Sequence, residues 1–108
     1  MLQRITDVEY VIRDFTRELI EGVEQNRRKI DELISTYSQG WDMDRMPVID
    51  RNILRIGIYE VLWSRDVPEA VAISEALELA HTLSTDESSK YINGVLSKVL
   101  EIKPDLVL

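Results

Sequence analysis

The sequence predicts an all-α fold, a helical bundle of about five helices joined by short connections. Apolar residues recur at spacings of three and four through successive segments, and no segment shows the alternation of a half-buried strand. The 108 residues combine 44% hydrophobic with 31% charged side chains, which suits one globular domain with a modest core. We therefore expect a single domain over residues 1–101, followed by a loose tail over residues 102–108.

The first two helices are predicted from their apolar stripes and from the residues that can end them. A helix over residues 7–24 places its apolar side chains on one face, namely Val8, Ile12, Phe15, Leu19 and Val23. Asn26 can cap a second helix, and Gly40 lies just past its end, where glycine is favoured. The expected buried face of this second helix consists of Ile30, Leu33, Ile34 and Tyr37.

Three more helices are expected after a linking segment over residues 41–46. Pro47 suits the first turn of a helix that continues to Ser64 and is apolar over most of its circumference. A fourth helix from Pro68 to Leu83 should bury a broad arc, formed by Ala72, Ile73, Ala76, Leu77, Leu79, Ala80 and Leu83. Ser84 and Glu87 have the spacing of a capping box before the fifth helix. The core stripe of that helix is Ile92, Val95, Leu96 and Val99.

Charge and composition restrict the partners of the protein. Thirteen basic and twenty acidic side chains give a formal net charge of −7. A chain this acidic repels nucleic acid unless its basic residues cluster, and its surface suits a basic protein partner better. Without cysteine it can form neither a disulfide nor a thiolate metal site. No apolar run is long enough to span a membrane, so we expect a cytoplasmic protein.

The sequence contains no recognisable constellation of catalytic residues. The single histidine, His81, falls on the polar face of the fourth helix, whereas a metal site needs several converging ligands. Glu75 and Glu78 lie three residues apart, but both are expected to be solvated and therefore unsuited to acid–base catalysis. Ser88 and Ser89 lack a nearby base, and no glycine-rich phosphate loop occurs. We predict a protein without enzymatic activity, cofactor or metal.

Three blocks of sequence, in this order and spacing, resemble the NusB family of bacterial transcription antitermination factors. They are "DRNILRIGIYE" from Asp50, "DVPEAVAISEALELA" from Asp66 and "SSKYINGVL" from Ser88. The resemblance extends over most of the chain, from about Asp14 to Leu100. It implies a non-enzymatic adaptor that joins NusE, a basic small-subunit ribosomal protein, on boxA RNA within the antitermination complex of RNA polymerase.

One departure from the family pattern bears on RNA binding. NusB proteins open with an arginine-rich helix, and nothing before Asp7 resembles it, so we expect weak affinity of this chain for boxA. Two alternatives follow: a NusB-derived protein-interaction module without RNA binding, or the RNA-binding domain of a ribosomal RNA methyltransferase. The block from Lys90 to Leu96 favours NusB over the methyltransferase domain. A body without the first helices should also expose an apolar surface near Tyr10 and Ile20, from which we expect a homodimer.

The candidate RNA-binding residues are Glu87, Lys90 and Tyr91, which lie along one edge of the fifth helix. Tyr91 could stack on an unpaired base and Lys90 could reach a phosphate. The structural alternative is that Tyr91 seals the margin of the core while Gly94 permits close helix packing. The resemblance supports the RNA-binding interpretation, because the matching positions flank the RNA site in NusB.

Two further groups of residues are singled out. The short linker carries one tryptophan and two methionines, Trp41, Met43 and Met46. Such side chains suit an adaptable protein-binding surface. The alternative is that they fold onto the core of the protein itself. Asp50 matches a position that is often acidic in NusB and lies near the contact with NusE. Finally, a set of polar residues on the apolar helices is expected to form a structural polar network, namely Arg55, Glu60 and Asn93.

Overall fold

A computed structural model of the protein describes residues 17–38 and 40–108, and the ordered elements among these residues are all helical. Residues 17–25 form a helix, and the first residues of the helix predicted over residues 7–24 lie outside the described residues. Four longer helices follow, α2 (Arg27–Tyr37), α3 (Val48–Leu62), α4 (Glu69–Leu83) and α5 (Asp86–Ile102). Two short 3₁₀ turns complete the order, η1 (Met43–Arg45) and η2 (Lys103–Asp105). The prediction of an all-α bundle is confirmed.

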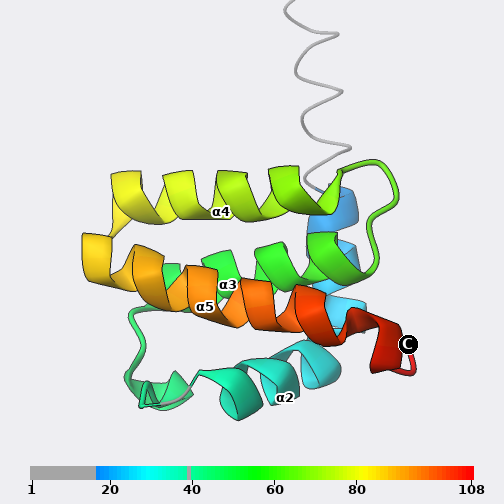
Figure 1. Ribbon diagram of the computed structural model, residues 1–108, viewed down its shortest axis with the longest axis horizontal. Helices are drawn as coiled ribbons and strands as arrows, with labels where there is room; N and C mark the ends of the chain where they lie inside the picture. The colour runs from blue at the N-terminus through cyan, green and yellow to red at the C-terminus, as the bar shows by residue number, and fades with distance from the viewer. Residues whose placement is uncertain (1–16, 39) are drawn as a thin grey trace, which may run out of the picture.

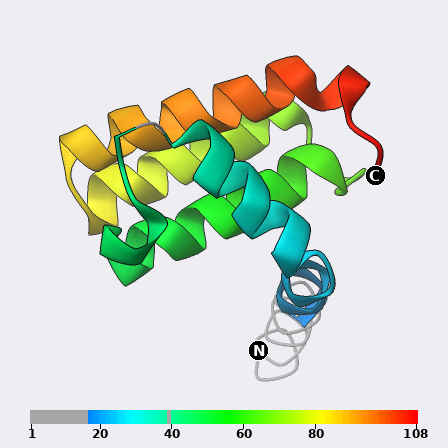
Figure 2. The same ribbon diagram turned by 90° about the horizontal axis from the view of Figure 1, so that it is seen from below.

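Helices α3, α4 and α5 run side by side and enclose the centre of the core, as Figures 1 and 2 show from two directions. Helix α2 crosses against α3 and α5 on the side away from α4. Helix α3 is the central element, and its most deeply buried apolar residues are Leu54, Ile58 and Val61. This matches the expectation that the helix is apolar over most of its circumference.

Helix α4 packs closely on α3 because its buried residues are small. Ala72, Ala76 and Ala80 form its buried face, which leaves little space between the two helix axes. The predicted broad arc is therefore too wide, since Leu79 and Leu83 are exposed. Leu83 is the last residue of α4, and Leu79 lies one turn before it at the margin of the alanine face.

The predicted caps are close to those in the structure but differ in detail. Thr85, rather than Ser84, is the N-cap of α5, and its hydroxyl accepts a hydrogen bond from the Ser88 amide at 3.0 Å. Asn26 stands at the start of α2, but its side-chain amide donates to the Gly22 carbonyl at 2.8 Å and so ends the preceding helix. Gly40 has a φ of 77°, a left-handed conformation that favours glycine.

The end of the chain is attached to the bundle instead of forming a loose tail. The Lys103 ammonium donates to the Val61 carbonyl at 2.9 Å and pairs with Glu69. Ile102 and Leu106 pack against the core. A cation at the carboxyl end of α3 also interacts favourably with the helix dipole, so these contacts tie η2 to α3 and α4. Within the described residues, no helix combines the length and the apolar character needed to cross a membrane.

Candidate functional site

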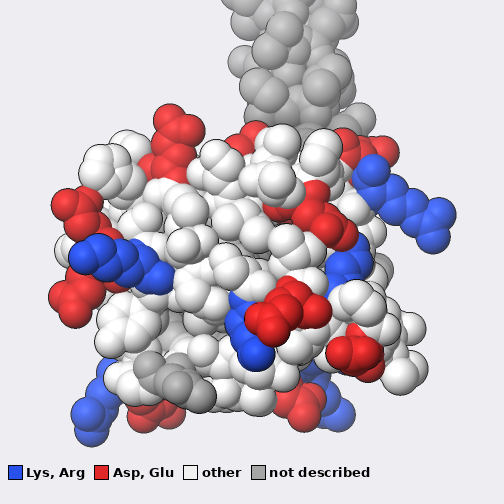
Figure 3. All heavy atoms as spheres, viewed as in Figure 1, with Lys and Arg blue, Asp and Glu red and all other residues white. Residues whose placement is uncertain are grey.

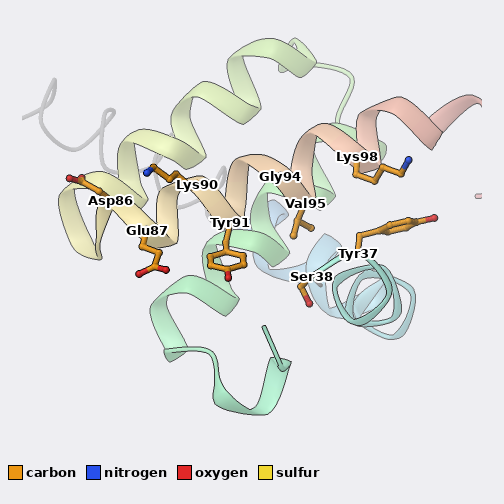
Figure 4. Close-up of a pocket in the computed structure, with 9 residues that line it drawn as sticks. All are labelled: Tyr37, Ser38, Asp86, Glu87, Lys90, Tyr91, Gly94, Val95 and Lys98. Atoms are coloured by element: carbon orange, nitrogen blue, oxygen red, sulfur yellow. The ribbon is translucent and has the colours of Figure 1, made fainter. Parts of the chain in front are cut away.

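The three residues predicted to bind RNA line one open groove along α5. The groove has a volume of about 830 Å³ and includes Glu87, Lys90 and Tyr91. The opposite wall comes from the end of α2, at Tyr37 and Ser38, as Figure 4 shows. This wall is not predictable from the sequence of α5, because it belongs to a different helix and the periodicity of one helix carries no information about its neighbours.

Helical spacing explains how α5 presents these side chains together. Positions 87, 91, 94 and 98 are separated by three or four residues, which places them in one row on the helix surface. The opposite face of α5 is buried through Ile92, Leu96 and Val99. Burial of that face fixes the rotation of the helix, and the groove-lining row is directed outward as a consequence.

The charge around the groove is mixed. Figure 3 shows basic and acidic side chains interspersed on the face formed by α4 and α5. Lys98 pairs with Glu101 at 3.6 Å, and His81 contacts Asp86 at 2.8 Å. Phosphate attraction on this face therefore depends on a few lysines, and aromatic stacking becomes correspondingly more important for any bound nucleic acid.

Tyr91 connects the groove to the segment between α2 and α3. Its ring lies 4.9 Å from the ring of Trp41, with an angle of 36° between the planes. In Figure 4 the Tyr91 side chain points from α5 toward this segment. Tyr91 is 37% exposed, so part of its ring remains accessible. The predicted RNA strip and the predicted partner-binding segment thus meet at one aromatic contact.

The linker residues divide between the surface and the core. Met46 is only 3% exposed and belongs to the core, whereas Trp41 and Met43 are half-buried against it. The Ser35 hydroxyl also contacts the Met43 sulfur at 3.9 Å. Folding of these apolar side chains onto the core accounts for most of their burial, and only the outer parts of Trp41 and Met43 remain exposed.

Asp50 does not lie on a partner-binding surface. It is 0% exposed, and its Oδ2 atom accepts a hydrogen bond from the Ser88 hydroxyl at 2.8 Å. Its Oδ1 atom has no hydrogen-bond partner among the described residues. The expected direct contact with a protein partner is therefore corrected: the carboxylate joins the start of α3 to the first turn of α5 inside the fold.

The three residues expected to form one polar network lie apart. Arg55 makes a two-pronged contact with Asp31 of α2, at 2.9 and 3.2 Å. Asn93 is exposed on α5, where it accepts a hydrogen bond from the Ser97 hydroxyl at 3.1 Å. Glu60 is buried and faces α4. The single-network expectation is wrong, since each residue has separate surroundings.

Burial raises the pKa of the Glu60 carboxyl above its usual value of 4.5, and the negative charge of Glu75 raises it further. A raised folded-state pKa means that ionisation of Glu60 opposes folding above that pKa, and that stability increases as pH falls toward 4.5. We expect Glu60→Gln to raise the melting temperature at neutral pH, with the gain shrinking toward pH 4.5. Thermal unfolding, monitored by circular dichroism across this pH range, measures the difference in melting temperature between Glu60→Gln and the wild-type chain. A lower melting temperature of the variant at neutral pH would contradict this prediction.

An apolar groove lies beside the helix of residues 17–25. It has a volume of about 280 Å³ and is lined by Ile20, Val23 and Ile56 among others. Ile20 is 59% exposed, as expected for the edge of an uncovered surface, while Tyr10 lies outside the described residues. The expected homodimer stays a prediction.

The fold and the groove define a class of protein: a small all-α domain with an open groove along one of its helices. Among the described residues, no group of three or more His, Cys, Asp or Glu side chains is arranged to hold a metal ion. The one histidine, His81, is largely exposed and contacts only Asp86 among the acidic residues of the described chain.

Comparison with known proteins identifies the family. The NusB family model matches residues 2–101, and the chain belongs to this family. It is 53% identical to the transcription antitermination protein NusB of Thermobifida fusca over 106 residues, which cover 98% of this chain and 75% of the relative. The corresponding protein of Paenarthrobacter aurescens is 48% identical over 107 residues, covering 99% and 79%.

A solved structure agrees with this assignment. NusB of T. maritima superposes with a TM-score of 0.75 at 38% identity, over 86% of this chain and 69% of that one. The chain is a transcription antitermination factor of the NusB type rather than an enzyme, as its sequence predicts.

Proposed function

We propose that the protein acts in antitermination by pairing with NusE and with boxA RNA in nascent ribosomal RNA transcripts, and that α5 carries the RNA contact. This role would place it in the cytoplasm, where bacterial transcripts are made. The observation that supports the RNA contact best is the groove, whose lining includes both Tyr91 and the neighbouring Lys90. A partly exposed aromatic ring beside a lysine is suited to stacking an unpaired base while its phosphate is held.

The proposed NusE contact centres on the segment between α2 and α3. Trp41 and Met43 expose part of their apolar side chains there. Asp42 and Asp44 are exposed beside them, in a chain with a net charge of −7. Exposed acids around adaptable apolar side chains are complementary to a basic protein partner. These two aspartates take over the role first assigned to the buried Asp50.

Substitution of Tyr91 tests the RNA contact. In the presence of NusE, Tyr91→Ala should weaken binding of a short single-stranded boxA RNA by roughly 5- to 150-fold, because one stacked base contributes about 1–3 kcal/mol. Tyr91→Phe retains the ring and should keep most of the affinity. Fluorescence anisotropy of end-labelled RNA measures both.

Two controls distinguish the possible outcomes of this experiment. The melting temperature of Tyr91→Ala reports how much the loss of the Trp41 contact disturbs the fold. NusE binding in the absence of RNA should stay close to that of the wild-type chain. Equal RNA affinity of the wild-type and Tyr91→Ala proteins would reject the RNA contact. Retained NusE binding with no RNA binding by the wild-type chain would support the alternative of a protein-interaction module.

A further inference from the structure

Gly94 is a glycine for which the fold itself gives no reason. It lies inside α5, where glycine is less stable than alanine. A Cβ atom built at this position meets no heavy atom within 4 Å in the described part of the chain. Its φ is not positive, since Gly40 is the glycine with that conformation among the described residues. Within the described residues, neither close packing nor an unusual backbone conformation requires glycine here, which argues against the alternative in which Gly94 permits helix packing.

The surroundings of Gly94 point to a ligand. It lines the groove of α5, and Lys90 and Lys98 stand one turn before and one turn after it, as Figure 4 shows. Four residues of α-helix rise about 6 Å, so the two lysines flank a gap on the helix surface. Both side chains are exposed. On the surface of α5, two lysine side chains therefore lie on either side of a position that has no side chain.

We propose that the sugar–phosphate backbone of bound single-stranded RNA crosses α5 at Gly94 and that Lys90 and Lys98 contact phosphates on either side. The absent side chain lets the RNA backbone approach the helix closely, which is a recurrent use of glycine. This inference rests on the proposed function and adds Gly94 and Lys98 to its site. The pairing of Lys98 with Glu101 at 3.6 Å is exposed and therefore weak, so a phosphate can replace Glu101.

Added bulk at Gly94 is the first test. Gly94→Ala should raise the melting temperature by about 4 °C, because alanine favours the helix and meets open space. Gly94→Leu should lower the affinity for boxA RNA in the presence of NusE by about tenfold or more, because its side chain occupies the path of the RNA backbone. Ser97→Leu adds similar bulk to an exposed position of α5 outside the groove, and its RNA affinity should match that of the wild-type chain.

The salt dependence of binding tests Lys98. Lys98→Gln should reduce the slope of log affinity against log salt concentration by about 0.7, the value for one phosphate of a single strand. Glu101→Gln is the matched control, because it breaks the same ion pair but keeps the lysine, and its slope should be unchanged.

The outcomes separate this inference from the function on which it rests. RNA binding that falls with Tyr91→Ala but not with Gly94→Leu would overturn the path across Gly94 and leave the proposed function standing. Weaker NusE binding by Gly94→Leu without RNA would show that the groove holds protein, which also overturns the inference. If neither Tyr91→Ala nor Gly94→Leu changes the RNA affinity, the proposed RNA contact on α5 fails as well.

Discussion

Asp50→Lys is expected to unfold the protein at temperatures at which the wild-type chain is stable. The carboxylate is completely buried and accepts a hydrogen bond from Ser88. It also lies in the first turn of α3, where the helix dipole favours a negative charge. A lysine there removes the acceptor and places a cation at the positive end of a helix. Breaking a buried charged contact costs about 3–5 kcal/mol, which corresponds to a melting temperature lower by more than about 12 °C.

Two variants make the Asp50 experiment decisive. Asp44→Lys introduces the same change of charge at an exposed position of η1, and its melting temperature should stay within about 2 °C of the wild-type value. Asp50→Asn keeps an acceptor oxygen for Ser88 and loses only the charge, so we expect a cost of about 1 kcal/mol. Differential scanning calorimetry measures all three. If Asp50→Lys and Asp44→Lys have the same melting temperature, the Asp50 carboxylate does not stabilise the fold. That result would favour the interpretation of Asp50 as a contact with a protein partner.

Asp50 also shows what sequence patterns miss. An acidic residue followed by Arg51 at the start of a helix resembles an ordinary solvated helix terminus. Its burial depends on Ser88, which is 38 residues away in the sequence. The same holds for Arg55, whose partner Asp31 is 24 residues away on another helix. Periodicity describes which face of one helix is apolar, but not which polar side chain of a second helix will meet it.

The grouping of the candidate RNA residues on one surface is predictable from the sequence because they lie on one helix. Glu87 and Tyr91 share a face by helical spacing alone, and the structure places both in the same groove. The contact of Tyr91 with Trp41 was not predictable, since it depends on how the linker folds back over α5. Helical periodicity therefore predicts which residues of one helix lie together, but it does not predict contacts between residues that a linker brings together.

Gly57 and Gly94 illustrate the same limit. Each lies within one of the sequence blocks that resemble the NusB family, and the sequence does not show which of them is needed for packing. The structure separates them: a Cβ atom at Gly57 would lie 3.0 Å from both terminal methyl groups of Leu96 and 3.6 Å from Ala76, whereas one at Gly94 meets open space. Gly57 is thus a position at which α3 packs directly against both α4 and α5. Close packing therefore excludes a large side chain at Gly57, whereas the described residues leave room for one at Gly94.

Gly57→Leu is accordingly expected to destabilise the fold severely. Leu96 is completely buried and Ala76 nearly so, so neither can move aside for a leucine side chain. Overpacking of this kind costs about 3 kcal/mol or more, beyond the roughly 1 kcal/mol that leaving glycine gains in helix propensity. Urea denaturation should show a correspondingly lower midpoint.

Two further variants show whether the loss of stability in Gly57→Leu comes from overpacking. Gly57→Ala requires Leu96 to shift by only a few tenths of an ångström, and the gain in helix propensity offsets that strain, so we expect a change within about 1 kcal/mol. Gly94→Leu makes the identical substitution on an open helix face and should leave the midpoint at or above the wild-type value. Equal midpoints for Gly57→Leu and Gly94→Leu would mean that α3 and α5 can separate without loss of stability, contrary to a closely packed layer of three helices.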